Sequence, residues 1–439
     1  MCTNFLLIPA LPIDPIIVDN IAIIGSGIAG LGCAHFLQSR ANVTVFEASD
    51  YVGGHSNTIN IDEGGGSEAV LDTGFMVYNE VTYPLLTRLF ADLDVPTKPT
   101  EMSFSVRHGA SGVEWNGSGL TKLFAQRRNL LSLRHWRFLL QLNRFNKEAV
   151  TALNEPEWAE MTLKDYVEAR GYGQDFLERY LVPMSSAVWS TPPEQMLLFP
   201  AMTLLRFWHN HGFLGLDTQH PWRTVDGGAR EYVKRLIAPF HDRIRTNTPV
   251  KSVHVSGHGM VGVESADGIE SFDKVIFATH ADQALRLLAS PSSLQRELLS
   301  PFAYQPNSVR VHTDPRFMPK TRRCWASWNY RSEATSDTSI HYWMNSLQGV
   351  SDKEDYFVSL NVGDRVPEAA CKRAIDYDHP LFDLDAIKAQ SRLPELNDTS
   401  GVTFFCGSYF RYGFHEDAFK SAVDLCTALV GSDPWEACA

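Results

Sequence analysis

Two stretches near the start of the chain have the apolar pattern of buried β-strands. Residues 20–24 (NIAII) form a run that stops at Gly25, and residues 42–46 (NVTVF) form a second run that stops at Glu47. Short apolar runs of this kind are typical of strands in a parallel sheet, where both faces are covered. The segment between the two runs is expected to be a helix, so the pattern predicts a strand–helix–strand unit.

Two later regions show different periods. In 131–150 the apolar residues Leu133, Trp136, Leu140 and Phe145 recur near helical spacing, and the region 106–220 is expected to be mostly helical. The region 291–395 is expected to form an antiparallel sheet roofed by these helices. Its strand-like runs are NSVRVHT (307–313), CWASWNY (324–330) with IHYWMN (340–345), and YFVSLN (356–361).

The loop after the first predicted strand has the spacing of a dinucleotide site. Gly25, Gly27 and Gly30 fall in G-x-G-x-x-G order, which allows a tight turn, close approach of a pyrophosphate, and packing of helix on strand. The pyrophosphate would lie at the helix N-terminus, where unpaired N–H groups attract an anion. Glu47, at the end of the second strand, can accept hydrogen bonds from both hydroxyls of a ribose. This unit fits NAD and FAD equally well.

The residues after Glu47 separate the two cofactors. Gly53-Gly54-His55 gives the spacing E-x5-G-G, which resembles the extended fingerprint of FAD proteins of the flavin-containing amine oxidase and phytoene desaturase superfamily. That superfamily usually has arginine where His55 stands, so one phosphate contact differs here.

Three further segments resemble the same superfamily. LDTGFMVYN (71–79) is similar to the loop that passes the isoalloxazine ring, and 244–282 is similar to the return into the FAD domain, with the Val250 backbone at the adenine. The segment 404–422 is similar to the C-terminal signature beside the ribityl chain and the flavin pyrimidine edge. The resemblance implies FAD, held by Gly25, Gly27, Ile28, Ala29, Gly30, Glu47, Ala48, Gly53, Gly54, His55, Gly74, Phe75, Met76, Val250, Ala278, Thr279, Gly407, Gly413, Phe414, His415 and Glu416.

The resemblance also implies the fold. It predicts an α/β protein with a discontinuous Rossmann-like FAD-binding domain of the glutathione-reductase type and an inserted α+β substrate domain. The FAD domain is expected over 20–105, 221–290 and 396–439, and the substrate domain over 106–220 and 291–395.

A narrower resemblance concerns the substrate. GFMVYNEVTYPLLTRLF, WASWNY, YWMNSLQ and GFHED together resemble a bacterial-type subfamily of predicted FAD-binding oxidoreductases. Genes of that subfamily often neighbour cyclopropane-fatty-acid-synthase-like methyltransferases. The resemblance implies lipid acyl chains as substrate and a lipid methyltransferase as a partner.

Few residues are candidates for the chemistry itself. Phe414 stands where amine oxidases often carry a tyrosine of their aromatic cage, and a phenyl ring suits an apolar substrate better. Those oxidases also tend to place a lysine near the flavin, on a strand that NSVRVHT (307–313) resembles. Val311 stands at the matching position in this sequence, and the missing lysine weakens an amine oxidase assignment. His312 is a candidate proton carrier, although a structural histidine has the same pattern.

Three asparagines, Asn329, Asn345 and Asn361, lie near the ends of aromatic-rich strands. Their carboxamides could orient a polar head or a carbonyl, with Asn345 as the candidate; turn formation is the alternative. The H-x-H pair of 209–212 has no further ligand at metal spacing, so no metal site is predicted.

Composition and charge limit the class of protein. Lysine and arginine total 39 against 51 acidic residues, a net charge of −12 that argues against a nucleic-acid partner. Seven cysteines without a CxxC pair suggest a reducing compartment. The apolar opening residues 1–20 lack a basic start and contain three prolines, so they are read as an extended leader of a cytoplasmic protein.

One segment reverses the overall charge. Between Glu114 and Glu148 no acidic residue occurs, and aromatic residues alternate with cations. Such a segment is expected to contact an anionic membrane peripherally at the inner membrane surface; a solvated helix face is the alternative. The cations are Lys122, Arg127, Arg128, Arg134, Arg137, Arg144 and Lys147, so the contact region is 122–147.

Three functions are compatible with these features. The first is an FAD-dependent oxidoreductase that passes hydride between flavin and an apolar substrate, an unsaturated or methyl-branched fatty acyl chain. The second is a flavin amine oxidase that uses O2. The third is an FAD-binding accessory protein of a lipid methyltransferase, with flavin as a scaffold.

Overall fold

The computed structural model describes residues 19–215, 218–257, 259–333 and 338–437. The extended leader expected over the first twenty residues lies almost entirely outside this range. In the part of the chain that is described, no helix is both long enough and apolar enough to span a bilayer.

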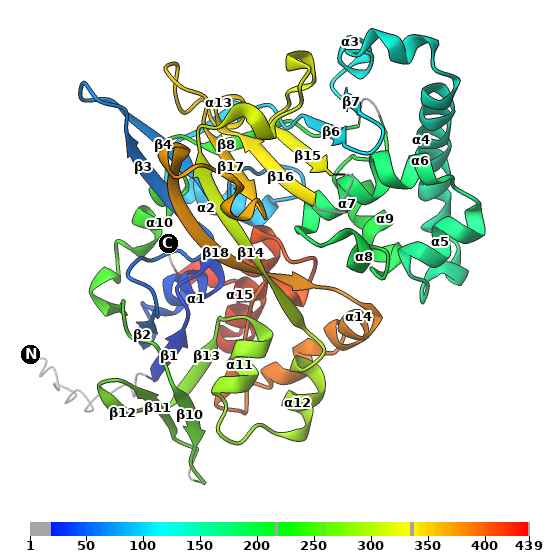
Figure 1. Ribbon diagram of the computed structural model, residues 1–439. Helices are drawn as coiled ribbons and strands as arrows, with labels where there is room; N and C mark the ends of the chain where they lie inside the picture. Colours follow the sequence, from blue (N-terminus) through cyan, green and yellow to red (C-terminus); the bar gives the residue numbers. More distant parts are fainter. Residues whose placement is uncertain (1–18, 216–217, 258, 334–337, 438–439) are drawn as a thin grey trace, which may run out of the picture.

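A five-stranded parallel sheet contains the predicted strand–helix–strand unit (Figure 1). The helix α1 (Ile28–Leu37) follows the first strand, and α10 (Arg230–Ile237) and α15 (His415–Val430) both contact α1. The strand order is β19 (Thr403–Phe405), β13 (Lys274–Phe277), β1 (Asn20–Ile24), β2 (Asn42–Phe46) and β9 (Ile244–Arg245).

Every pairing in this sheet is parallel, which agrees with the predicted α/β fold. Its strands come from 20–46, 244–277 and 403–405. A three-stranded antiparallel sheet packs on it through Phe272, whose ring lies 5.9 Å from that of Phe46. That sheet is formed by β10 (Ser252–Val255), β11 (Val261–Ser265) and β12 (Gly268–Phe272).

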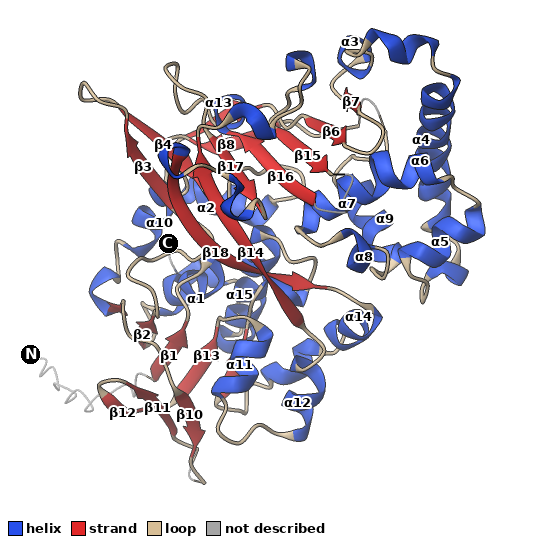
Figure 2. Ribbon diagram, in the orientation of Figure 1, coloured by secondary structure: helices blue, strands red, loops and turns tan. Residues whose placement is uncertain are grey.

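A seven-stranded sheet forms the second body of structure and crosses the molecule in Figure 2. It contains the three predicted runs, and it also contains β18, β6 and β7, which the sequence patterns did not predict. The boundary expected at residue 105 falls inside β6. The strand order is β18 (Cys371–Leu381), β14 (Ala303–His312), β17 (Phe357–Leu360), β16 (Thr338–Trp343), β15 (Trp328–Ser332), β6 (Phe104–His108) and β7 (Val113–Asn116).

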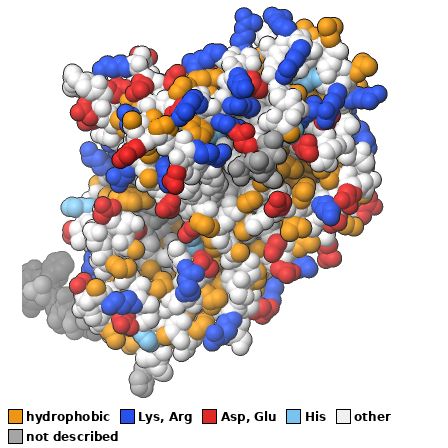
Figure 3. Space-filling view, viewed as in Figure 1, with side chains coloured by type: hydrophobic (Ala, Val, Ile, Leu, Met, Phe, Trp, Pro, Cys, Tyr) orange, Lys and Arg blue, Asp and Glu red, His pale blue; other side chains and the backbone are white. Residues whose placement is uncertain are grey.

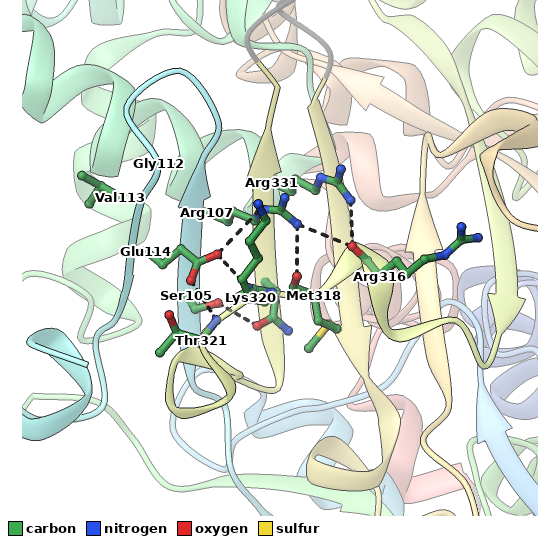
Figure 4. Close-up of polar contacts among 12 residues, drawn as sticks. Ser105, Arg107, Gly112, Val113, Glu114, Arg316, Met318, Lys320, Thr321 and Arg331 are labelled. Atoms are coloured by element: carbon green, nitrogen blue, oxygen red, sulfur yellow. Dashed lines mark hydrogen bonds and ion pairs between the residues drawn. The ribbon is translucent and has the colours of Figure 1, made fainter. Parts of the chain in front are cut away.

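A buried carboxylate joins two parts of this sheet region (Figure 4). Glu114 on β7 accepts hydrogen bonds from the backbone N–H groups of Lys320 and Thr321, at 2.7 and 2.9 Å. Arg107 on β6 lies 3.7 Å from the same carboxylate and donates to the Met318 carbonyl at 3.2 Å. The β6–β7 hairpin is therefore tied to the segment that follows β14.

The region 106–220, predicted to be mostly helical, is helical only after β7, because β6 and β7 occupy its first residues (Figure 1). The predicted helix at 131–150 is α4, but its apolar residues do not share one face: Leu133, Trp136 and Leu140 are exposed, whereas Phe138 and Phe145 are buried. The helices are α3 (Leu120–Leu123), α4 (Leu133–Ala152), α5 (Leu163–Arg170), α6 (Gln174–Phe176), α7 (Val182–Trp189), α8 (Pro193–Met196) and α9 (Ala201–Asn210).

Two short antiparallel pairs connect these bodies. Because β5 (Thr97–Thr100) pairs with β8 (Trp222–Val225), the chain enters and leaves the helical region at neighbouring points. The other pair is β3 (Thr58–Asp62) with β4 (Glu68–Asp72). The remaining helices are α2 (Pro84–Asp92), α11 (Ala281–Leu287), α12 (Ser293–Leu299), α13 (Met344–Leu347) and α14 (Leu384–Gln390).

Candidate functional site

A cavity of about 700 Å³ lies where the carboxyl ends of β1 and β13 face the seven-stranded sheet. Open α/β sheets bind ligands at such strand ends, beside the point where the strand order reverses. All the cofactor residues predicted from the sequence line this cavity except Gly30 and Glu416. Segments far apart in the chain, from Gly25 to His415, are therefore brought to one wall.

The glycine loop forms one end of the cavity. Gly25 has a φ of +103°, which favours glycine, and a side chain at Gly30 would place its Cβ 2.0 Å from the Gly25 carbonyl oxygen. Gly30 thus lets the helix approach the loop, which explains its absence from the wall. The N-cap of α1 is Gly27, with no side-chain cap and no acidic residue in the first turn. These N–H groups suit a diphosphate.

Glu47 is held rigidly beside this loop. Its carboxylate accepts hydrogen bonds from the backbone N–H of Ser26 at 3.0 Å, the Ser26 hydroxyl at 2.5 Å and the backbone N–H of Ser49 at 2.8 Å. The Ser26 carbonyl in turn accepts from the Gly53 N–H at 3.0 Å, so the two halves of the fingerprint are joined. A carboxylate fixed on the cavity wall fits the ribose of a dinucleotide.

Three histidines from separate segments meet on the wall. His55 stacks on Tyr377 at 4.7 Å, and its ring lies 5.6 Å from His379 and 6.5 Å from His280. Burial lowers the pKa of His55 and His280 to about 4 and that of His379 to about 3, so all three are neutral at pH 7. The Nε2 of His55 is buried without a hydrogen-bond partner, which is typical of an atom that meets a ligand.

The loop predicted to pass the flavin is fixed by buried polar contacts. Gln348, which the sequence analysis did not single out, donates to the Asp72 carboxylate at 2.7 Å, the Thr224 hydroxyl at 2.8 Å and the Met76 carbonyl at 3.3 Å. Burial raises the pKa of Asp72 to about 6. The His415 ring stacks on Phe75 of this loop at 3.9 Å.

The N-terminus of α15 also reaches the cavity. Phe414 is its N-cap residue, and the Asp417 carboxylate accepts from the Phe414 N–H at 3.0 Å. The Nε2 of His415 lies 2.8 Å from the Tyr232 hydroxyl. Burial lowers the pKa of His415 to about 3, so its imidazole is neutral.

Glu416 was predicted to lie beside the flavin, but its side chain does not line the cavity. One residue along α15 turns the side chain about 100° away from that of His415. The Glu416 carboxylate instead accepts from the N–H groups of Leu85 and Leu86, both at 2.9 Å. It caps the N-terminus of α2, whose own N-cap residue Tyr83 supplies no side-chain bond.

The part of the cavity beyond Phe414 is aromatic. Phe207 stacks on Phe414 at 4.6 Å and on His211 at 3.8 Å, and burial lowers the pKa of His211 to about 4. Among the described residues of the whole wall there is no lysine. The apolar part includes Met102, Trp189, Phe207, Phe213, Trp222, Trp328, Tyr342 and Leu347.

Sequence reasoning missed most of this apolar wall, because its residues come from separate helices, loops and strands. His211 was considered only as half of a metal-binding pair. Its Nδ1 lies 2.9 Å from the Phe207 carbonyl oxygen, and the ring faces the cavity.

The two candidate catalytic residues lie outside the cavity wall. His312 is fully buried within the sheet, where its Nε2 lies 2.7 Å from the Ser359 hydroxyl and its Nδ1 accepts from the Asp314 N–H. The pairing of β14 with β18 has an irregularity between Val311 and His312, so these two residues do not follow the strand's regular alternation. Val311, at the position aligned with the oxidase lysine, is also buried away from the cavity.

Asn345 serves a loop. Its carboxamide donates to the carbonyls of Ser351 and Glu354, at 2.8 and 2.7 Å, and accepts from the Tyr356 N–H at 2.8 Å. With these bonds the side chain closes the turn between α13 and β17. Asn361 has a φ of +60° and likewise belongs to a turn.

Comparison with known proteins identifies the cofactor. The family model described as flavin containing amine oxidoreductase matches residues 28–354. No curated protein matches the chain.

Solved structures share the fold at low sequence identity. Cyclohexylamine oxidase from Brevibacterium oxydans IH-35A is 17% identical, with a TM-score of 0.66 over 94% of this chain and 100% of that chain. Putrescine oxidase bound to putrescine is 14% identical, with a TM-score of 0.65 over 94% and 99%. A fatty acid isomerase from P. acnes that produces CLA is 14% identical, with a TM-score of 0.65 over 93% and 98%.

The glycine loop, the fixed carboxylate and the uncapped helix N-terminus fit FAD, and the family model covers most of the chain. The chain therefore belongs to the flavin-containing amine oxidoreductase family and is an FAD-dependent oxidoreductase.

Proposed function

We propose that the enzyme transfers hydride between flavin and an apolar substrate, an unsaturated or methyl-branched fatty acyl chain. The observation that carries this proposal is the uncharged aromatic wall beyond Phe414. The charged side chains on the described wall are Glu47, Arg286 and Asp378. Glu47 follows β2 and Arg286 is on α11 after β13, both beside the parallel sheet. Asp378, by contrast, is an exposed residue of β18 next to His379, whose ring lies 5.6 Å from that of His55.

Bound FAD accepts or donates a hydride, which is the chemistry that desaturation, saturation or a double-bond shift of an acyl chain requires. The protein's own residues position the chain and exclude water. Phe207, Phe213 and Phe414 offer surface that an acyl chain can cover, at about 0.8 kcal/mol for each buried methylene group. The neutral imidazole of His211 lies on the same wall and can exchange a proton with a substrate carbon or a water molecule.

Amine oxidation with O2 is the second candidate. The family description and the names of two structural neighbours, putrescine oxidase and cyclohexylamine oxidase, favour it. A neighbour that is a fatty acid isomerase favours a lipid. Because all three neighbours share the fold at 14–17% identity, the fold does not choose between these substrates. The absence of lysine from the described wall and the phenyl ring of Phe414 support the apolar one.

The experiment is an anaerobic titration of the purified holoenzyme. Phospholipids with unsaturated or methyl-branched acyl chains, the corresponding free fatty acids, and the amines putrescine and cyclohexylamine are added separately. The visible absorption of oxidised flavin is followed, and the acyl chains are then analysed by mass spectrometry. The proposal expects altered acyl chains, with loss of the flavin absorption where the reaction is a net desaturation; a saturation is expected only in a parallel sample whose flavin has first been reduced chemically.

Each alternative gives a different result. Bleaching by amines alone, with peroxide formed on admitting O2, would establish the amine oxidase and overturn the proposal. A flavin that no compound reduces, together with unaltered acyl chains, would favour the accessory-protein alternative. In that case a lipid methyltransferase partner should lose activity when the flavoprotein is removed.

A further inference from the structure

One face of the helical region exposes an unusual number of large apolar side chains. Thirteen such side chains are exposed in the described part of the chain, and six of them fall within residues 120–140. Leu131 is 91% exposed, Leu133 77% and Leu140 66%. We call this the leucine-rich face, formed by Leu120, Leu130, Leu131, Leu133, Trp136 and Leu140.

Two contacts of Trp136 hold the segments of the leucine-rich face together. The Trp136 indole on α4 donates to the Leu130 carbonyl at 2.9 Å and lies 5.1 Å from the ring of Phe124, just beyond α3. The loop between α3 and α4 is therefore held against the first turns of α4. Ser132 caps α4 by accepting from the His135 N–H.

The opposite side of α4 is firmly packed, so the exposure of the leucines is fixed by the fold. Phe138 lies 5.9 Å from Trp115 on β7, and Phe145 lies 5.8 Å from Trp208 on α9. Both phenylalanines are buried. A rotation of α4 that buried Leu133 and Leu140 would expose these two aromatic residues instead.

Four arginines neighbour the leucines in the chain, and two of them have no partner among the described residues. Arg127 and Arg137 are exposed and, among the described residues, make no ion pair or side-chain hydrogen bond. Arg128 donates to the Gly112 carbonyl, while Arg134 is paired with Asp175. Figure 3 shows lysine and arginine side chains gathered over this end of the molecule, although the whole chain carries −12.

We propose that the leucine-rich face docks on the surface of an anionic phospholipid bilayer. Exposed leucines and a tryptophan beside arginines are the combination that inserts at the headgroup level, with the cations at the lipid phosphates. A symmetric dimer through this face would bring its cations against the same cations of a second copy, so charge favours an anionic bilayer over such a pairing. The docking surface stands independently of the proposed function, since it depends on no reaction.

The position of α4 gives this docking a consequence for the cavity. Phe145 of α4 packs on Trp208 of α9, and α9 also supplies Phe207 to the cavity wall. The bilayer surface would thus lie one helix away from the apolar end of the cavity.

The test is sedimentation of the holoenzyme with vesicles of phosphatidylcholine alone or of phosphatidylcholine with phosphatidylglycerol, at low and high salt. The wild type is expected to sediment preferentially with the anionic vesicles. The combined variant Leu131→Ser/Leu133→Ser/Leu140→Ser should bind at least about tenfold more weakly to them. Arg127→Ser/Arg137→Ser should lose about 30-fold in binding, confined to the anionic vesicles and to low salt.

The control variants are Ile269→Ser and Arg296→Ser, which change an exposed apolar residue on β12 and an exposed cation on α12. Both should bind as the wild type does, and all variants should retain their flavin and thermal midpoint. The proposal would be overturned if the wild type bound neither kind of vesicle, or if the leucine variants bound anionic vesicles as tightly as the wild type. A leucine variant that changes only the oligomeric state would instead identify a protein interface.

Discussion

Glu47 has a defined position because three donors hold its carboxylate, two from Ser26 and one from Ser49. Glu47→Ala is expected to weaken FAD binding about tenfold to a hundredfold, the effect of losing a hydrogen bond to a charged group. The measurement is the dissociation constant of FAD from the deflavinated protein, with Glu160→Ala at an exposed position as control. Equal affinity in Glu47→Ala and wild type would remove Glu47 from the cofactor site.

Five histidines on the cavity wall, of which His211 is buried and the other four are half-buried, control the response to acid. Burial depresses their folded-state pKa values from 6.5, so the stability they contribute is present above about pH 6.5 and is lost as the pH falls towards 4. Asp72 and Asp417 act oppositely, because burial raises their pKa values to about 6 and 7. The histidines are His55, His211, His280, His379 and His415, with pKa values of about 4, 4, 4, 3 and 3.

The histidines outnumber the two carboxyl groups, so the holoenzyme should lose stability between pH 6.5 and 4.5. The measurement is its thermal midpoint, followed by circular dichroism. His379→Gln removes one titrating group and should reduce the pH slope of the unfolding free energy by about 1.4 kcal/mol per pH unit. A midpoint that is constant or rises on acidification would contradict this account of the neutral histidines.

Substitutions of Phe213 test the apolar wall, because its side chain lines the cavity and is only 8% exposed. A carboxylate there would be buried without a partner, so Phe213→Glu should raise the half-saturating concentration of an acyl phospholipid at least about tenfold. Phe213→Leu keeps the wall apolar and is the matched control. Both variants should keep their flavin. A tighter response of Phe213→Glu to putrescine with unchanged lipid binding would count against an acyl substrate.

At the scale of elements, α15 and α2 are joined by Glu416. Glu416→Ala leaves the N–H groups of Leu85 and Leu86 without acceptors, and we expect it to lower the free energy of unfolding by about 1–2 kcal/mol. The measurement is denaturant unfolding of the holoenzyme. Glu416→Gln retains an acceptor oxygen and should lose less. A changed flavin spectrum with an unchanged free energy of unfolding would instead indicate that Glu416 contacts the flavin.

The strands that sequence patterns predicted are the apolar ones. β1 and β2 are short apolar runs and β14 has the alternating buried residues Val309 and Val311, whereas β18 reads CKRAIDYDHPL and lies at the edge of its sheet. An edge strand has a solvent-facing side and tolerates charges and proline, so it lacks an apolar signature. Yet β18 brings His379 to the cavity.

Helical period alone did not reveal which face of α4 is buried. The apolar residues Leu133, Trp136 and Leu140 are at helical spacing, but Phe138 and Phe145 occupy the packed side. A helix with apolar residues on two faces leaves one of them outside whichever way it packs. The position of Glu416 was missed for a similar reason, since a motif does not specify the direction of each side chain along a helix.

At the scale of the whole molecule, local motifs were sufficient for the nucleotide end of the site. Gly25, Glu47 and Gly54 are close in sequence and their spacing reflects one strand–helix–strand unit. The apolar end depends on packing between α9, β8 and the seven-stranded sheet, which no single segment encodes. The cofactor was therefore predictable from the sequence, and the shape of the substrate wall was not.

The most direct test of the central claim follows the atoms of the acyl chain. Holoenzyme is incubated with a phospholipid whose unsaturated or methyl-branched chain carries deuterium near the double bond, and the recovered chain is analysed by mass spectrometry. The account predicts loss of hydrogen or a shifted double bond, or gain of hydrogen when the flavin has first been reduced chemically, and each change requires bound flavin and is suppressed in Phe213→Glu. Recovery of unaltered chains from an enzyme that oxidises amines would contradict it.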